Sequence, residues 1–209
     1  MASAIDKTAV LQGKYIRLEP LQPSHAAAFV AATQAEPLIY QWTHVPRNDA
    51  EAAAYIDTAV AWRDAGTAVP FATVRLEDGA VIGSTRFFNL EYWPWPAGQP
   101  RHGHKLPDVC EIGYTWLARS AIRTAANTEA KFLMLTHAFE TWGALRVCFH
   151  TDLRNLRSQA AIARIGGIRE GVLRVHRLAA DGMARDSARY SIIAKEWPGV
   201  KARLSRLLM

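Results

Sequence analysis

Two Asp-Gly dipeptides, each between two runs of strand-forming residues, constrain this fold more than any other feature. Asp78-Gly79 separates residues 68–76 from 80–89, and Asp181-Gly182 separates residues 168–177 from 184–193. An Asp-Gly pair favours the positive φ angles of a tight turn, so each pair of runs is predicted to form an antiparallel hairpin. Further strands are predicted at 15–19, 109–117 and 146–151, which makes seven strands in all.

Helical periodicity occupies the segments between these strands. Ser24 is predicted to cap the first helix, which Pro37 closes, and Asn48 or Asp49 to cap the second. Because strand–helix–strand units lie between the hairpins, the fold class is predicted to be α/β, with one mixed sheet flanked by helices. The predicted helices cover 24–34, 50–62, about 128–142, 155–165 and a short amphipathic segment that ends at Leu208.

Length and composition fit one soluble domain over residues 1–209. Half of the residues are apolar, and none of the apolar runs approaches the roughly 20 residues of a membrane-spanning helix. The chain start at Met1 lacks a signal-peptide pattern, so we expect a cytoplasmic protein without a membrane partner. Cys110 and Cys148 are predicted to be core thiols, and His137, His150 and His176 to be structural. We predict no metal site.

The formal charge is +6, and its excess lies in the last third of the chain. Such crowding indicates either an anionic partner or a solubilising surface. A phosphorylated small molecule fits better than nucleic acid, because the basic residues are not interleaved with exposed aromatics. The arginines concerned are Arg154, Arg157, Arg164, Arg169, Arg174, Arg177, Arg185 and Arg189.

Residues 90–107 break every periodicity and are predicted to form a long ordered loop. They contain three aromatic residues, four prolines and a basic cluster that includes His102 and His104. Loops of this length inside a compact domain are commonly functional. The alternative is a flap whose tryptophans only pack on the sheet.

Two strand–loop–helix units point to a phosphate-containing ligand. The first is the strand 111–117, the basic loop 119–126 and a helix that opens near Asn127, so that first-turn N–H groups and Arg123 converge on one point. In the second, Asn155 caps a helix that carries Ser158 and stops at Gly166-Gly167.

Together with the opening segment 11–20, these units resemble the GNAT acetyltransferase superfamily, in its RimJ/RimL-like branch of ribosomal-protein N-terminal acetyltransferases. The resemblance covers roughly residues 12–197 and implies a twisted, splayed, mostly antiparallel sheet that admits the pantetheine arm of acetyl-CoA between two strands. The sequence departs from the family in two places: Ala125 and Asn127 stand where glycines are usual, and Ile162 stands where many members have tyrosine. The implied cofactor contacts are Tyr114, Thr115, Trp116, Leu117, Arg123, Thr124, Ala125, Ala126, Asn127, Thr128, Asn155, Ser158 and Arg164.

The chemistry that the resemblance implies is direct transfer of the acetyl group from acetyl-CoA to a primary amine. Glu111 is the candidate base, acting through a water, or else a strand-end carboxylate paired with an arginine. Ser158 matches the position of a hydroxyl near the thioester sulfur, and Tyr190 is a reserve proton donor. We expect no acyl-enzyme, because neither cysteine has a base beside it in the sequence.

The acceptor stays open at this stage. The resemblance implies the α-amine of a protein, peptide or amino acid, whereas Tyr40, Trp42, Trp93 and Trp95 are predicted to floor a pocket for an aromatic or apolar small amine. A non-catalytic domain that binds acyl-CoA is the alternative function. We expect a monomer or homodimer that does not bind nucleic acid.

Overall fold

The computed structural model describes residues 5–34 and 37–209, so the expectation drawn from Met1 lies outside these residues. One sheet runs through the whole fold in the order β1-β2-β3-β4-β5-β6-β8-β7, and the β5–β6 pair is parallel while all its other pairs are antiparallel. This confirms the predicted α/β class with a mostly antiparallel sheet. The strands are β1 Leu11–Gln12, β2 Ile16–Pro20, β3 Ala68–Arg75, β4 Val81–Glu91, β5 Val109–Leu117, β6 Arg146–Asp152, β7 Ile168–Leu178 and β8 Ala184–Ile193.

Both predicted hairpins form, and their turn glycines have the expected conformation. Gly79 has φ +70° between β3 and β4, and Gly182 has φ +77° between β7 and β8. The eighth strand, β1, was not predicted, because two residues are too few to show a period-2 pattern.

The helices match the predicted ones with two corrections. They are α1 Ala26–Thr33, α2 Asp49–Asp64, α3 Ala126–Thr136, α4 Leu156–Arg164 and α5 Trp197–Leu207. Ser24 does not cap α1, since it lies in a preceding 3-10 turn, Pro23–His25. The third helix changes to a π turn, His137–Thr141, where the Trp142 N–H donates to the His137 carbonyl at 3.0 Å.

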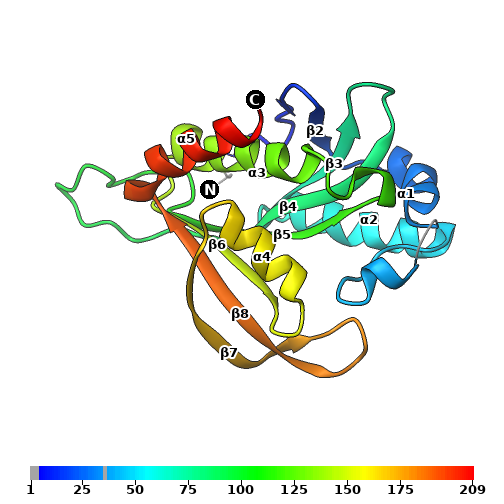
Figure 1. Ribbon diagram of the computed structural model, residues 1–209. Helices are drawn as coiled ribbons and strands as arrows, with labels where there is room; N and C mark the ends of the chain where they lie inside the picture. Colours follow the sequence, from blue (N-terminus) through cyan, green and yellow to red (C-terminus); the bar gives the residue numbers. More distant parts are fainter. Residues whose placement is uncertain (1–4, 35–36) are drawn as a thin grey trace.

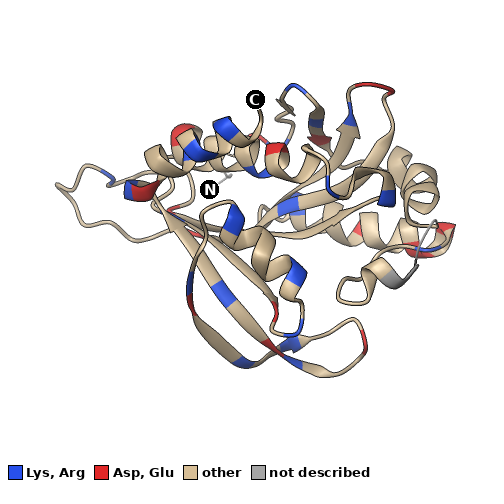
Figure 2. Cartoon of the chain, in the orientation of Figure 1, with Lys and Arg blue, Asp and Glu red and all other residues tan. Residues whose placement is uncertain are grey.

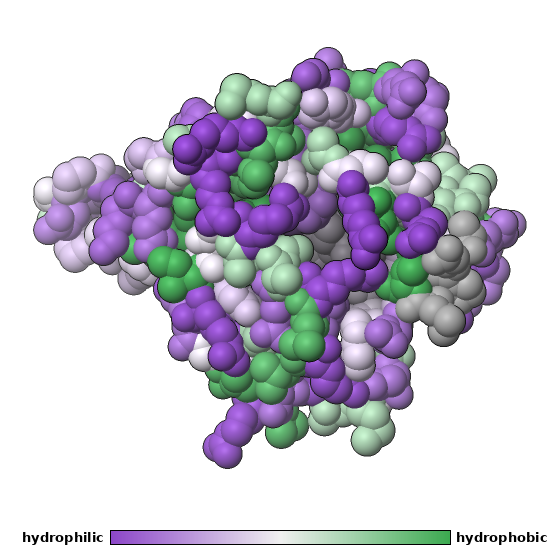
Figure 3. All heavy atoms as spheres, viewed as in Figure 1, coloured by the Kyte–Doolittle hydropathy of each residue, from purple (hydrophilic) through white to green (hydrophobic). Residues whose placement is uncertain are grey.

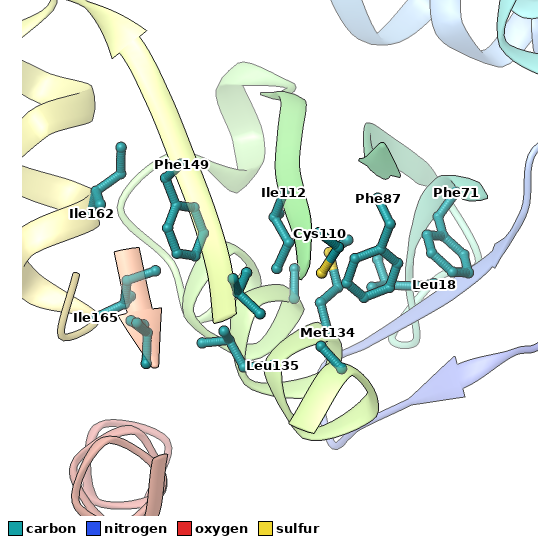
Figure 4. Close-up of a cluster of buried hydrophobic side chains, with 14 of the residues drawn as sticks. Leu18, Phe71, Phe87, Cys110, Ile112, Met134, Leu135, Phe149, Ile162 and Ile165 are labelled. Carbon is teal, nitrogen blue, oxygen red and sulfur yellow. The ribbon is translucent and has the colours of Figure 1, made fainter. Parts of the chain in front are cut away.

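The helices cover both faces of the sheet (Figure 1). On one face α3 and α5 pack over the main core, which Ile162 joins from α4; Figure 4 shows Phe87, Ile112, Met134 and Phe149 meeting there. On the other face α1 and α2 enclose a smaller cluster around Phe29 and Trp116. Side chains that alternate along β4 and β5 therefore face two different compartments.

Charge and hydropathy distinguish the β7–β8 ribbon from the rest of the surface. Lys and Arg lie along this ribbon and α4 (Figure 2), as the sequence indicated. Apolar side chains also show there (Figure 3), and Val175, Leu178 and Met183 are exposed. Among the described helices none is both long and apolar enough to cross a membrane.

Candidate active site

The central feature of the site is the separation of β5 from β6. These parallel strands pair at three positions, the last of which joins Glu111 to Cys148, and then diverge. The β5 edge from Ile112 to Leu117 therefore has no ladder partner from β6 within residues 5–34 and 37–209. A bulge at Tyr114, whose φ is +51°, adds to the irregular backbone at this edge. Unpaired backbone amides and carbonyls beside a slot suit an extended amide-containing ligand, as predicted for the pantetheine arm.

The loop after β5 presents the start of α3 to the same region. Arg123 has φ +65° and is exposed together with Thr124. The Thr124 hydroxyl accepts from the Ala126 N–H at 3.2 Å, and the N-cap residue Ala125 supplies no side-chain acceptor. The first-turn amides and the positive end of the helix dipole therefore lie next to the exposed residues Arg123 and Thr124, an arrangement that suits an anion site.

The second predicted motif lies against the first. Arg164 of α4 donates to the Thr128 hydroxyl of α3 at 2.9 Å. Asn155 caps α4, since its side-chain oxygen accepts from the Ser158 N–H at 3.0 Å. Arg164 therefore links the α3 and α4 motifs, and Asn155 caps the second of them.

Glu111 lies at the point where β5 and β6 separate, and its side chain is enclosed. Arg177 Nη2 lies 3.3 Å and Asn89 Nδ2 2.8 Å from its Oε2, while His150 Nδ1 lies 2.9 Å from its Oε1. Burial raises the pKa of Glu111, but the contacts with His150, Arg177 and Asn89 outweigh it and hold the pKa below the ordinary value. The carboxylate is therefore ionised at neutral pH.

A cavity of about 180 Å³ opens beside this carboxylate, and two histidines line it. The rings of His150 and His176 lie 5.0 Å apart, and both ring nitrogens of His150 are buried without a well-aligned hydrogen bond in the described residues, although Nδ1 lies 2.9 Å from Glu111 Oε1. Both histidines were predicted to be structural. A signal was available: His150 follows Cys148 by two residues in a strand and so faces the same side.

Tyr190 is on the other face of the sheet. It pairs with Phe149, which points into the main core, and its hydroxyl donates to Gln159 Oε1 at 3.1 Å. The Tyr190 hydroxyl and the Glu111 carboxylate therefore lie on opposite faces of the sheet and do not form one site. Ser158, half-buried in the first turns of α4, lies on the side of the sheet that carries α4.

The four aromatic residues predicted to form one floor lie in two separate places. Tyr40 donates its hydroxyl to the carbonyl of Leu117, at the end of β5, and burial raises its pKa to about 12. Trp42 stacks on Arg154, with 4.4 Å between ring and guanidinium. Trp93 and Trp95 instead bind Asp108, directly before β5, through the Trp93 N–H and the Trp95 indole N–H. The two pairs lie at opposite ends of β5, which is roughly 25 Å long. The prediction that all four aromatic residues line one pocket is therefore wrong.

The two cysteines lie in the core, as the sequence indicated. Cys110 and Cys148 are free and buried, and burial raises the pKa of the Cys110 thiol. His102 and His104 contact the backbone carbonyls of Trp95 and Trp142. Among the described residues no group of three potential ligands is arranged to hold a metal ion.

The burial of Lys131, on α3, predicts how the free energy of unfolding depends on pH. The residue is 6% exposed. Its ammonium donates to the Thr115 hydroxyl at 2.7 Å and to the Thr85 hydroxyl at 3.2 Å. Burial lowers the pKa to about 7. Above about pH 7 the unfolded chain therefore holds a proton that the folded chain has lost, so the free energy of unfolding is expected to rise by about 1.4 kcal/mol per pH unit.

Urea unfolding between about pH 7 and about pH 9 measures this dependence. Lys131→Met is expected to flatten the rise, while Lys105→Met, at an exposed loop position, keeps it. Equal slopes in the wild type and Lys131→Met would contradict the assignment.

This fold is that of an acetyltransferase. Residues 16–168 match the acetyltransferase (GNAT) domain family, and the chain belongs to that family. It is an acetyl-CoA-dependent N-acetyltransferase, and the family match favours this over a non-catalytic acyl-CoA-binding domain.

Relatives cover nearly all of the chain. A protein of Bacillus subtilis (strain 168), provisionally named ribosomal N-acetyltransferase YdaF, is 27% identical over 194 residues, 88% of this chain and 92% of its own. The structure of a GCN5-related N-acetyltransferase from Brucella melitensis is 27% identical, with a TM-score of 0.81 over 97% of this chain and 86% of that one. Mycobacterium smegmatis RimJ, in complex with CoA-disulfide, shares the fold at 22% identity, with a TM-score of 0.75 over 95% of this chain and 91% of its own.

Proposed function

We propose that this chain acetylates the α-amine of a peptide or protein N-terminus at the slot between β5 and β6. The observation that carries the proposal is that these strands separate directly after Glu111, and that the Glu111–His150 pair lies at the point of separation. Acetyl-CoA, when bound, supplies an activated acyl carbon. The exposed start of α3 with Arg123 would hold its phosphates, and the unpaired β5 edge from Tyr114 to Leu117 would bind its amides.

In this proposal His150 is the general base and Glu111 is a positioning residue. With its proton on Nδ1, facing the Glu111 carboxylate, His150 leaves Nε2 free to accept a proton in the cavity. An ammonium must lose a proton before it can attack, and the ionised carboxylate stabilises the imidazolium that results. The neutral amine would then form the C–N bond as the C–S bond breaks, the nitrogen would give up its second proton to solvent, and the sulfur would gain one from solvent, directly or through the Ser158 hydroxyl.

Three features support a peptide or protein acceptor. The aromatic residues do not close around a small-molecule pocket, the cavity beside Glu111 is open, and the relative from Bacillus subtilis is named for ribosomal substrates. A small amine has few atoms to make contacts with, so it would need an enclosed pocket to hold it in position.

The proposal is tested by incubating the protein and acetyl-CoA with N-terminal peptides and small amines, reading thiol release and N-terminal mass gain. We expect peptides to be acetylated and acetyl-CoA to raise the melting temperature. Transfer to small amines alone would contradict the proposed acceptor.

A variant of the phosphate loop tests the cofactor site. Ala125→Glu places a carboxylate where the phosphates would bind, and is expected to weaken acetyl-CoA binding at least roughly tenfold, because like charges repel. The helix itself favours an acidic residue at this end, so the variant should fold. Ala54→Glu, at an exposed position of α2, is the matched control and should bind normally. Normal binding by Ala125→Glu would place the phosphates elsewhere.

A further inference from the structure

Three hydrogen-bond donors without an acceptor lie on the sheet face that α1 and α2 cover. They are Arg86 Nε, the Tyr55 hydroxyl and Trp116 Nε1, all buried and unpartnered within residues 5–34 and 37–209. Arg86 lies opposite Gly113, and Trp116 lies opposite Ser84, two residues from Arg86 along β4, so both point to the same face. Folded proteins satisfy nearly all buried polar groups, so a cluster of unmet donors indicates an acceptor-rich ligand.

Arg86 adds a formal charge to this donor cluster. It is 2% exposed, and no carboxylate of the described residues pairs with it. Three rings surround the guanidinium instead, at 4.3 Å for Tyr114, 5.1 Å for Tyr55 and 5.3 Å for Trp62. Cation–π contacts offset only part of the cost of burying a cation, so an anionic group would complete the site.

The donor cluster lies next to the Glu111–His150 pair. Phe88 lies directly opposite Glu111 and two residues from Arg86 on the same face of β4, which is roughly 7 Å along a strand. The Phe88 ring is 5.0 Å from the Tyr114 ring, and Tyr114 is 39% exposed. Tyr114 is therefore a partly exposed side chain that contacts both Arg86 of the donor cluster and Phe88, which lies opposite Glu111.

We propose that Arg86, Tyr55 and Trp116 bind a carboxylate of the acceptor, so that the preferred amine has an acidic group a few bonds away. This inference rests on the proposed transfer at the Glu111–His150 pair; a peptide acceptor agrees with the proposed function as stated, and a free amino acid as sole acceptor would replace its acceptor class. The carboxylate has two possible sources, the α-carboxylate of a free amino acid and the side chain of an acidic residue at a peptide N-terminus.

Two matched acceptor pairs separate these sources. One is a peptide that begins with Asp against the same peptide beginning with Asn; the other is free asparagine against asparagine amide. In one of the pairs the acidic member is expected to have a kcat/KM roughly tenfold to hundredfold higher, the range of a charge-assisted hydrogen bond.

The variants Arg86→Lys and Tyr55→Phe test the residues. Each is expected to lower the acidic-to-neutral ratio while the neutral acceptors keep their kcat/KM within about threefold. Tyr55→Phe removes only a hydroxyl and keeps the ring, so it should fold even if Arg86→Lys does not. Arg203→Gln loses a charge at an exposed position of α5 and should keep the wild-type ratio.

The possible outcomes are distinct. Turnover of neutral and acidic acceptors at equal rates overturns the inference and leaves the proposed transfer intact. Equal losses for both acceptors in the variants assign Arg86 a structural role and also overturn it. Thermal stabilisation by the acetylated Asp peptide can be measured without turnover. If this stabilisation occurs and depends on Arg86 while no amine is acetylated, the carboxylate site is supported and the proposed function fails.

Discussion

His150→Gln is expected to lower kcat by roughly 10²-fold to 10⁴-fold, the range over which a positioned general base contributes. The glutamine keeps approximate size and polarity but accepts no proton at neutral pH. Steady-state thiol release with the best peptide acceptor measures the effect. The loss should fall on kcat, and the acidic limb of the rate–pH profile should disappear, because that limb reports protonation of the base.

Glu111→Gln gives the second half of this test. If Glu111 only positions His150, its neutral amide should lower kcat less than His150→Gln does and shift the acidic limb without removing it. His44→Gln, at an exposed position, is the matched control and should retain wild-type kinetics. A His150→Gln enzyme with wild-type kcat would return the role of base to Glu111.

Glu129→Ala is expected to lower the free energy of unfolding by about 3 kcal/mol or more, because each buried N–H group left without an acceptor costs about 1–3 kcal/mol. The carboxylate of Glu129, a residue that is 3% exposed, accepts from the backbone N–H groups of Lys14, Tyr15 and Ile16 at 2.7, 2.7 and 2.8 Å. Alanine would leave these donors without an acceptor and detach the start of β2 from α3. Gly13 shows how close the fit is, since a Cβ there would lie 2.3 Å from the Glu129 carboxyl carbon.

Urea unfolding of Glu129→Ala and Glu129→Gln measures this effect. The glutamine keeps one acceptor oxygen and should lose less stability than alanine. Glu77→Ala, on an exposed turn, is the control and should change stability by less than about 0.5 kcal/mol. If Glu129→Ala unfolds like the control, the N-terminal segment is held by other contacts.

Local patterns determined most of the secondary structure. The strand 109–117 was predicted with its observed bounds, and Asn155 was identified as a helix cap, because turn chemistry and capping depend on a few adjacent residues. The failures were at segments where local preference is weak. Ser24 lost its capping role to a 3-10 turn that begins with Pro23, and the π turn after Thr136 involves no sequence signal that we recognised.

The sequence by itself determined the hairpins, the order of elements, the loop that feeds α3 and, through family resemblance, the acetyltransferase class. Only the tertiary structure decided which side chains share a compartment. It brought His150 to Glu111, moved Tyr190 to the opposite face, and separated Trp93 from Tyr40 by the length of a strand. The physical reason is that these groupings depend on strand register and on the point where β5 and β6 diverge, and residues far apart in the chain fix both.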